Sequence, residues 1–463
     1  MMKRRTTDGK TAMQKAYFVG IGGIGMSALA RYFNDMGWDI YGYDRTGTAL
    51  TEQLEQEGIH ITYEDHPAHI PNDIDLGVYT PAIPVDNKIL NRMKAMDIPL
   101  KKRAEVLGEV VRNKKTIAVA GTHGKTTTSG LTAYLLRACG IDATAVLGGI
   151  IPQFGSNYIK GTSPWVVVEA DEYDRSFLHL FPDVAIVTSI DPDHLDIYGD
   201  PQTMYDTYLQ FIKQVKDGGH VILHWEVADL LDNDFIQDLL NTRKVTVYGR
   251  EGALGELGAI SYQNEKTHFT WKVEGKPHEV EMQMPGKHNV SNAIAAMHAG
   301  MVAGAKITCL TEQAGHFSGI WRRFETRYHD GRITIIDDYA HHPTELGAAI
   351  QTARKRYPGR KITGIFQPHL YSRTRDFVKG FAEALDALDE VWILKIYPAR
   401  EQPIEGVNSS MIKKNMRNAN VHLATKEDIL QRMNTEDAEV ILVLGAGDLH
   451  LLIPSLINKI KTQ

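Results

Sequence analysis

The segment VAGTHGKTTT, residues 119–128, contains the residues whose types and spacing are best suited to chemistry. It follows an apolar, strand-like run from Thr116 to Ala120 and opens a stretch with helical periodicity. A glycine-rich turn in this place presents backbone N–H groups to phosphate oxygens, and the following helix N-terminus adds partial positive charge. Lys125 can reach the β- and γ-phosphates, and the Thr126 hydroxyl can hold Mg²⁺. The segment predicts a variant ATP-binding loop, in which Gly121 supplies the turn because valine replaces the first glycine of the common loop.

Acidic residues follow the next two strand-like runs. EADEYD, residues 169–174, ends the run that starts at Trp165, and DPDHLD, residues 191–196, follows the run from Val184 to Ile190. Ligands of an open parallel sheet gather at the carboxyl ends of its strands, so these side chains should face the phosphates. Carboxylate and imidazole groups there suggest a site for two Mg²⁺ ions. Solvated acidic loops are the alternative interpretation of either segment alone.

A second nucleotide signal lies near the N-terminus. GIGGIG, residues 20–25, follows a predicted strand and matches the dinucleotide fingerprint, and Asp44 ends the next strand where a ribose-binding acid belongs. The physical requirement is only a pyrophosphate at a helix N-terminus, which NAD and a UDP-sugar share. Tight packing between strand and helix without a ligand is the alternative.

Three further segments contain candidate binding residues. In GKHNVSN, residues 286–292, Asn289 and Asn292 share one helix face and could bond an adenine edge, although Asn289 could equally cap the helix. DDYAHHP, residues 337–343, and FQPHLYSRTR, residues 366–375, each follow a predicted strand. Arginine suits bidentate capture of a carboxylate or phosphate, but surface arginines are common.

The elements that would position these residues are strands alternating with helices, which predicts parallel sheets. Between residues 252 and 284 the pattern becomes alternating and polar, as in antiparallel strands, and a helix from Asn289 to Ala303 follows. Three consecutive α/β domains are expected. The predicted strands are Ala16 to Val19, Asp39 to Tyr43, Leu76 to Tyr79, Thr116 to Ala120, Trp165 to Glu169, Val184 to Ser189, His220 to His224, Lys244 to Tyr248, Ile333 to Ile336, Ile362 to Phe366, Glu390 to Leu394 and Val440 to Leu444.

Composition limits the class of protein. The 463 residues, 43% hydrophobic and 23% charged, suit about three globular domains, and the net charge of −6 argues against a nucleic-acid surface. No apolar stretch is long enough to span a membrane, and the start of the chain lacks the apolar core of a signal peptide. Cys139 and Cys309 are expected to be buried thiols in a reducing compartment. These features predict a cytoplasmic protein.

Taken in order along the chain, the motifs resemble those of the Mur ligases. The phosphate-loop variant marks the superfamily, and GIGGIGMS, DYAHHPTE and FQPH mark one member of it. The resemblance implies an α/β fold of three consecutive domains: a Rossmann-like N-terminal domain over residues 1–112, a central P-loop ATPase-type domain over 113–322 and a Rossmann-like C-terminal domain over 323–463. It also implies ATP-dependent ligation of L-alanine to the lactyl carboxylate of UDP-N-acetylmuramate through an acyl phosphate, by a monomer or homodimer that uses two Mg²⁺ ions.

The resemblance assigns a role to each candidate residue. Catalysis falls to Lys125, Glu169, His194 and Arg323, and the metal ligands are Thr126, Glu169 and His194. ATP is bound by Gly121, Thr122, His123, Gly124, Lys125, Thr126, Thr127, Asn289, Asn292, Arg323 and Asp338. The UDP-sugar is bound by Gly22, Gly23, Ile24, Gly25, Met26, Ser27 and Asp44, and the amino acid by Tyr339, His341 and Arg373. Leu370 departs from the family, which often has arginine there, so carboxylate capture falls mainly on Arg373.

Two other functions stay open at this stage. A recycling ligase that attaches a whole tripeptide to the same UDP-sugar would share the motifs of the first two domains. An NAD-dependent oxidoreductase would use residues 20–25 for its cofactor and the phosphate loop for regulation.

Overall fold

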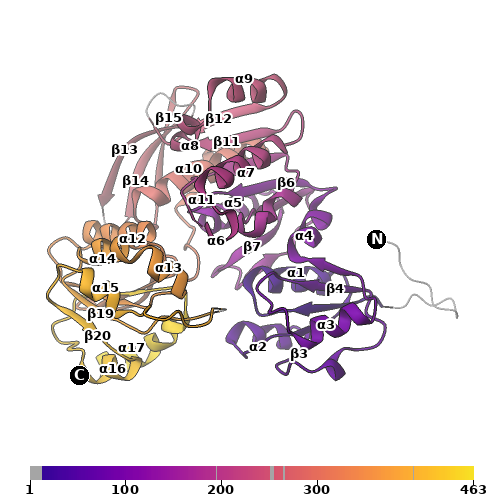
Figure 1. The fold of residues 1–463 in the computed structure, drawn as a ribbon. Coiled ribbons are helices and arrows are strands. Elements are labelled where there is room, and N and C mark those ends of the chain that lie inside the picture. The colour runs from indigo at the N-terminus through magenta and orange to yellow at the C-terminus, as the bar shows by residue number, and fades with distance from the viewer. Residues whose placement is uncertain (1–12, 194, 251–254, 264–265, 400, 463) are drawn as a thin grey trace, which may run out of the picture. The chain divides into compact units, whose positions relative to one another are not determined.

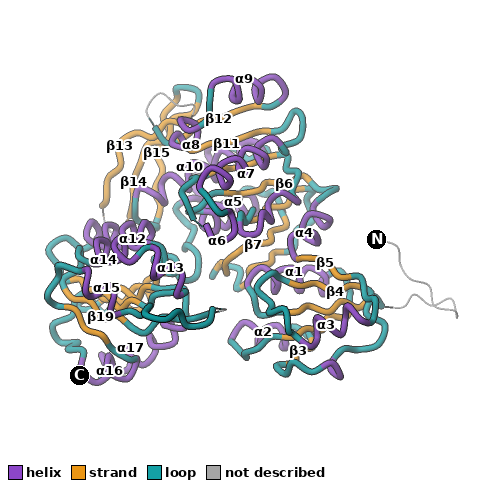
Figure 2. Tube along the Cα trace, viewed as in Figure 1, coloured by secondary structure: helices purple, strands orange, loops and turns teal. Residues whose placement is uncertain are grey.

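The computed structural model describes residues 13–193, 195–250, 255–263, 266–399 and 401–462, which form three sheets flanked by helices (Figures 1 and 2). By backbone contacts the chain divides into two compact units. The first contains the chain up to Ala259, Phe269–Glu281 and Ser291–Phe317; the second contains Ile260–His268, Met282–Val290 and the chain from Ser318 onward. The α/β class and the three sheets agree with the sequence-based prediction.

The N-terminal sheet has five parallel strands in the order β3-β2-β1-β4-β5. This is the Rossmann order. The order of the strands reverses at β1, because β2 and β3 lie on one side of it and β4 and β5 on the other, and ligands of such sheets bind in the crevice at this point. The prediction missed β3 and β5, since each has only three residues and neither is buried. The elements are β1 Lys15–Val19, α1 Ile24–Asp35, β2 Asp39–Tyr43, α2 Ala49–Gln56, β3 His60–Thr62, η1 Pro67–His69, β4 Leu76–Tyr79, α3 Lys88–Ala95, β5 Leu100–Lys102 and α4 Arg103–Val111.

The central sheet has ten strands in the order β15-β14-β13-β12-β11-β10-β6-β9-β7-β8. Its strands are β6 Lys115–Ala120, β7 Thr144–Ile151, β8 Ser156–Ile159, β9 Trp165–Glu169, β10 Val184–Val187, β11 His220–His224, β12 Lys244–Tyr248, β13 Gly255–Gln263, β14 Lys266–Val273 and β15 Lys276–Met282. Its helices are α5 Lys125–Ala138, η2 Tyr173–His179, α6 Leu195–Tyr198, α7 Pro201–Lys213, α8 Trp225–Leu230, α9 Asn233–Thr242, α10 Lys287–Val302 and α11 Ile307–Ala314. Glu274 and Gly275, both with positive φ, join β14 to β15 in a two-residue turn, so this pair is antiparallel as predicted.

Strand β6 lies between β9 and β10 and runs parallel to both. The carboxyl ends of the three strands are therefore neighbours. The phosphate loop follows β6, one acidic segment follows β9 and the other follows β10. This order brings together the segments that the sequence had marked.

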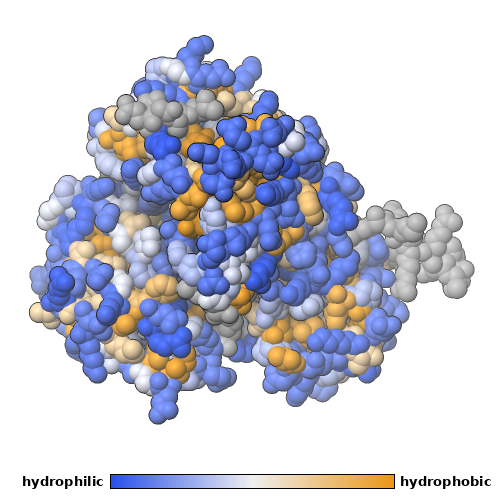
Figure 3. Space-filling model, turned by 45° about the horizontal axis from the view of Figure 1, so that its top comes forward, coloured by the Kyte–Doolittle hydropathy of each residue, from blue (hydrophilic) through white to orange (hydrophobic). Residues whose placement is uncertain are grey.

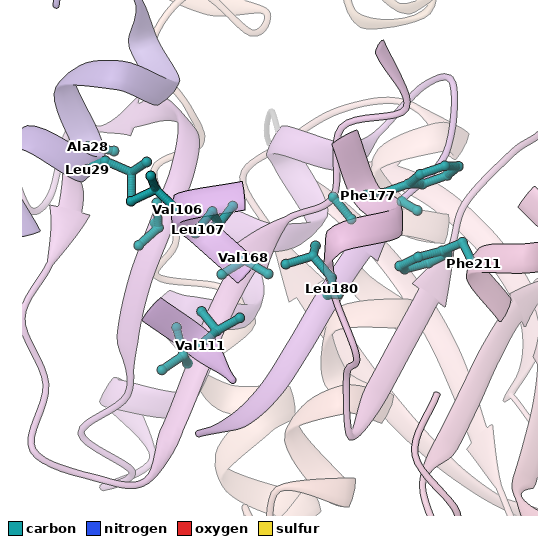
Figure 4. Close-up of a cluster of buried hydrophobic side chains, with 14 of the residues drawn as sticks. Ala28, Leu29, Val106, Leu107, Val111, Val168, Phe177, Leu180 and Phe211 are labelled. Carbon is teal, nitrogen blue, oxygen red and sulfur yellow. The ribbon is translucent and has the colours of Figure 1, made fainter. Parts of the chain in front are cut away.

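One hydrophobic cluster joins the N-terminal and central sheets. It includes Leu29 of α1, Leu107 of α4 and Val168 of β9, together with Phe177 and Phe211 (Figure 4). Polar contacts reinforce it: Arg31 of α1 is buried, donates to Asn157 Oδ1 at 2.5 Å and pairs with Glu57 at 2.7 Å. The two sheets therefore belong to one compact unit.

The two cysteines correct the sequence-based expectation. Cys139, which directly follows α5, and Cys309, in α11, form a disulfide across a sequence separation of 170 residues, with their Cα atoms 5.8 Å apart. Both residues are half-buried rather than buried. The expectation of two buried thiols was wrong because the periodicity of each helix says nothing about which helix packs against it.

We expect the Cys139→Ser variant to lose roughly 2–5 kcal/mol of unfolding free energy, because the bond closes a long loop in the unfolded chain. Thermal melting of oxidised protein measures this loss. Reductant should lower the melting temperature of the wild type towards that of the variant and leave the variant unchanged. Equal melting of the wild type with and without reductant would contradict the prediction.

The C-terminal sheet has six strands in the order β16-β17-β21-β18-β19-β20, of which only β16 is antiparallel to its neighbour. The carboxyl ends of β17, β21 and β18 are thus adjacent, which brings the segments after Asp338, Leu444 and Phe366 to one edge. The strands are β16 Glu325–His329, β17 Thr334–Asp338, β18 Ile362–Phe366, β19 Glu390–Ile393, β20 Val421–Leu423 and β21 Val440–Leu444. The helices are α12 Pro343–Arg356, α13 Tyr371–Asp376, α14 Val378–Leu385, α15 Ser410–Asn415, α16 Lys426–Arg432, η3 Asp448–Leu452 and α17 Ile453–Lys461.

Hydrophilic side chains cover most of the face seen in Figure 3, with smaller groups of hydrophobic ones between them. Among the described residues, no helix combines the length and the apolar character needed to cross a membrane.

Candidate functional site

The phosphate loop connects β6 to α5 and depends on two glycines. Gly121 has φ of +135° and Gly124 has φ of +84°, a region that L-residues rarely adopt. A Cβ atom on Gly121 would lie 2.0 Å from Thr188 Oγ1, and one on Gly124 would lie 2.6 Å from Asn292 Oδ1. Both glycines are therefore required by backbone conformation and by close approach.

The segment after β10 holds the loop in place. Thr188 Oγ1 donates to the His123 carbonyl at 2.5 Å, and the His123 N–H donates to Ser189 Oγ at 2.9 Å. Thr122 bonds the same segment through its N–H, to Ser189 O at 3.1 Å, and through Oγ1, to Asp191 O at 3.0 Å. These contacts fix the positions of Thr122 and His123, two predicted ATP-binding residues.

Thr126 and Glu169 lie together, as the sequence predicted. Thr126 Oγ1 donates to Glu169 Oε1 at 3.2 Å, and the Gly148 N–H donates to Glu169 Oε2 at 3.2 Å. A hydroxyl and a carboxylate beside a phosphate loop are oxygen ligands that suit Mg²⁺. Within the described ranges no three His, Cys, Asp or Glu side chains are grouped as a metal site, and His194, the third predicted ligand, lies outside these ranges.

Lys125 is directed to the loop and to the acidic segment. Its Nζ donates to Gly121 O at 2.6 Å and lies 2.8 Å from Glu172 Oε2. Burial alone would lower the pKa of Lys125, but the negative charges of Glu172, Asp171 and Glu169 outweigh burial and raise it. Lys125 is therefore a firmly charged cation. The sequence analysis did not identify Glu172 as its partner.

The two asparagines of α10 differ in their surroundings. Asn292 lies against Gly124 of the phosphate loop, and its contact with a nucleotide stays a prediction. Asn289 donates from Nδ2 to Pro285 O at 2.7 Å, and α10 already begins at Lys287, so Asn289 does not cap the helix. Thr127 lies in the first turn of α5.

The N-terminal glycine segment forms a tight turn from β1 into α1. Gly22 N–H donates to Asp44 Oδ2 at 2.8 Å, and Gly23 precedes the first helical residue, Ile24. Met26 and Ser27 are buried; Ser27 Oγ donates to Ile24 O and accepts a hydrogen bond from Asn157 Nδ2. The structure therefore gives Met26 and Ser27 packing roles, and nucleotide contact by them stays a prediction.

Arg103 is a candidate that the sequence analysis missed. The Arg103 guanidinium would lie 3.1 Å from a Cβ atom on Gly25, and Arg103 Nη2 lies 3.1 Å from Asp171 Oδ2. Arg103 thus contacts both the N-terminal glycine turn and the acidic segment after β9. The basic stretch Lys101–Arg103 was the only signal in the sequence, and no binding role was predicted for it; the domain boundary was placed further along the chain, after residue 112.

Asp338 and Arg323 lie at the edge of the C-terminal sheet. The Asp338 carboxylate accepts from Phe324 N–H at 2.8 Å and from Ala340 N–H at 2.7 Å. Burial raises its pKa to about 6, against the opposing charge of Arg323. The Arg323 guanidinium lies 5.4 Å from the centre of the Tyr339 ring, so three predicted residues lie together.

His341 is held by Glu345, which the sequence analysis did not identify. The Glu345 carboxylate accepts from the His341 N–H at 3.0 Å and lies 3.8 Å from an Arg323 nitrogen. Burial lowers the pKa of His341 to about 4; Glu345 opposes this shift and the nearby Arg373 adds to it. His341 is therefore neutral near pH 7, and Arg373 is a buried residue of α13 close to it.

Comparisons with known proteins agree with this geometry. Three family models match: "Mur ligase family, catalytic domain" over residues 15–115, "Mur ligase middle domain" over 119–300 and "Mur ligase, glutamate ligase domain" over 322–447. The chain is 40% identical to the UDP-N-acetylmuramate–L-alanine ligase of Cytophaga hutchinsonii, with 96% of each chain covered.

Solved structures are also similar to the chain. The UDP-N-acetylmuramate–alanine ligase of Thermotoga maritima has a TM-score of 0.83 and 28% identity, covering 97% of this chain and 99% of that one. The murein peptide ligase of Psychrobacter arcticus has a TM-score of 0.72 and 22% identity over the same shares, which is a likeness of fold alone.

Proposed function

Because the chain belongs to the Mur ligase family, we propose that it catalyses the ATP-dependent joining of L-alanine to the lactyl carboxylate of UDP-N-acetylmuramate, a step in making peptidoglycan precursors. The observation that carries the proposal is the group of Lys125, Thr126 and Glu169 at neighbouring strand ends. Such a group serves phosphoryl transfer, and the relatives are named for this ligation. The NAD-dependent alternative lacks support, since the three matching family models all describe Mur ligases.

The chemistry proceeds in two steps. A carboxylate oxygen of the sugar attacks the γ-phosphorus of ATP, the bond to the β-phosphate oxygen breaks, and an acyl phosphate and ADP form. The amine of L-alanine then attacks the acyl carbon and phosphate leaves, with one proton lost from the nitrogen. The first step makes the poor acyl donor reactive, because phosphate is a far better leaving group than oxide.

Residues of the first unit are assigned to ATP and the UDP-sugar. Lys125 stabilises the charge that develops on the transferred phosphoryl group. Thr126 and Glu169 would hold Mg²⁺, with His194 proposed for a second ion, and the metal would neutralise phosphate charge. Gly22, Gly25 and their neighbours in the N-terminal turn are proposed to bind the pyrophosphate of the sugar nucleotide.

Residues of the second unit are assigned to the amino acid and to ATP. Neutral His341 can accept a hydrogen bond from the alanine amine, and Arg373 is suited to its carboxylate. Tyr339 is proposed to bind the amino acid together with them. Three further residues are proposed to bind ATP: Arg323, Asp338 and Asn289. We further propose the domain limits 1–112, 113–322 and 323–463, a cytoplasmic location and a monomer or homodimer.

The proposal predicts that phosphate release requires both UDP-N-acetylmuramate and L-alanine. We expect kcat/KM for L-alanine to exceed that for L-alanyl-γ-D-glutamyl-diaminopimelate at least about a hundredfold, roughly 3 kcal/mol in transition-state binding. A pocket built for a methyl side chain excludes a tripeptide, although serine or glycine would react slowly. Comparable rates with the tripeptide would assign the chain to the recycling ligases, and release without the sugar nucleotide would refute the proposed function.

A further inference from the structure

Glu172 is a buried acid for which the proposed function has no role. It belongs to the acidic segment after β9, where each acid contacts a different cation. Asp171 pairs with Arg103 at 3.1 Å, Asp174 pairs with Lys102 at 2.8 Å, and Glu172 pairs with Lys125 at 2.8 Å. Only Glu172 among them is almost fully enclosed, with 1% of its side chain exposed, so its pairing with the phosphate-loop lysine is the least solvated of the three.

The ammonium group of Lys125 has three hydrogen atoms to donate, and the protein accepts all three. Two acceptors are carbonyls of the loop, Gly121 O at 2.6 Å and Thr122 O at 3.3 Å. The third is the Glu172 carboxylate, with Oε1 at 2.9 Å. A phosphate oxygen that binds Lys125 must therefore replace one of these acceptors. The carbonyls are fixed by the backbone of the loop, which leaves the side chain of Glu172 as the acceptor that can yield.

The surroundings of Glu172 fix its backbone and disfavour its charge. Tyr198 Oη donates to the Glu172 carbonyl at 2.5 Å, and Tyr208 of α7, on whose pKa Glu172 acts, is fully buried. Burial raises the pKa of the Glu172 carboxyl to about 7, although the charge of Lys125 opposes this shift. The charged form of Glu172 is thus stabilised by Lys125, and the loop carbonyls hold Lys125 in place.

We propose that Glu172 is a positioning residue that holds Lys125 at the phosphate loop and gives up its place on the ammonium group to a phosphate oxygen when ATP binds. This inference rests on the proposed use of ATP. In this role Glu172 competes with the nucleotide for Lys125. Glu172 holds the ammonium group of Lys125 at the loop, and the negative charge of Glu172 weakens nucleotide binding.

Binding of ADP and of the β,γ-imido analogue of ATP, each with Mg²⁺ and measured by calorimetry, tests the proposal. Glu172→Gln keeps an oxygen acceptor for Lys125 but removes the competing charge, so we expect Kd to fall by roughly tenfold. In the Lys125→Ala background the same substitution should change Kd by less than about twofold, because the competition requires the lysine. Glu172→Asp keeps the charge and should resemble the wild type more closely than Glu172→Gln does.

The matched control is Asp174→Asn, which removes an acid of the same segment that pairs with Lys102 and should leave Kd unchanged. Weaker nucleotide binding by Glu172→Gln in a protein that melts normally would overturn the proposal, as would an equal change with and without Lys125. If Glu172→Gln fails to fold, weaker binding by Glu172→Asp would overturn it instead. A wild type that binds the analogue but releases no phosphate with L-alanine and the sugar nucleotide would refute the proposed function and leave the role of Glu172 standing.

Discussion

Replacement of Lys125 by alanine is expected to lower ligation by roughly a thousandfold, about 4 kcal/mol of transition-state stabilisation. Lys125 supplies a half-buried, charged ammonium at the loop, and the loop carbonyls and Glu172 orient it. Such pre-oriented charge stabilises the transferring phosphoryl group more than a mobile surface lysine could. Phosphate release with saturating L-alanine and UDP-N-acetylmuramate measures the effect.

The fold of this variant must be checked, because it leaves Glu172 without its cation. Burial already raises the pKa of Glu172, so the carboxyl can become neutral once the lysine is gone, and the loss of stability should be modest. Lys160→Ala is the control: this exposed lysine pairs with Asp35 and should leave the rate unchanged. A well-folded Lys125→Ala enzyme that retains more than a few per cent of the activity would refute the role of Lys125.

The core of the ATP site could be predicted from the sequence because its signals are local. A buried strand, a glycine turn and a helix start lie within the segment of Lys115–Ala138, and their order alone indicates a phosphate loop. The position of Glu169 followed from a general property of parallel sheets, which gather ligands at the carboxyl ends of strands. Most predicted strands match the structure within two residues because they are mostly apolar and buried.

The contacts that could not be predicted from the sequence depend on tertiary packing. The pairing of Lys125 with Glu172 crosses 47 positions and that of Arg103 with Asp171 crosses 68, and no local pattern connects them. The Cys139–Cys309 disulfide joins residues that are still further apart in the sequence, 170 positions. Short edge strands such as β8 and β20 lack the apolar run that identifies a central strand, so periodicity does not detect them.

The surroundings of His341 could be predicted only in part. The segment DYAHHPTE suggested a binding loop, but Glu345 acts through a capping box in which it accepts the His341 and His342 N–H groups. The spacing of His342 and Glu345 is a recognisable helix-start signal. A search for caps as well as for chemical motifs would have found Glu345.

Replacement of Arg373 by alanine is expected to raise the KM for L-alanine on the order of several hundredfold while changing the KM for ATP little. Arg373 is buried in α13, and its charge acts on His341, so the guanidinium and the imidazole share one neighbourhood. A buried guanidinium binds a carboxylate through two parallel hydrogen bonds, and its removal leaves the substrate carboxylate desolvated and uncompensated. Leu370, which immediately precedes α13, carries no charge that could replace it.

Two further variants separate this role from mere packing. Arg373→Lys keeps the charge but loses the planar fork, so its KM for alanine should lie between those of the wild type and of Arg373→Ala. Arg375→Ala, in the same helix, removes an exposed arginine that pairs with Asp376 and should leave both KM values unchanged. If Arg373→Ala retains the KM of the wild type for alanine, the carboxylate is bound elsewhere. If the KM for ATP rises in parallel, Arg373 supports the C-terminal fold as a whole, because loss of a buried side chain there would disturb Arg323 and Asp338 as much as the amino-acid pocket.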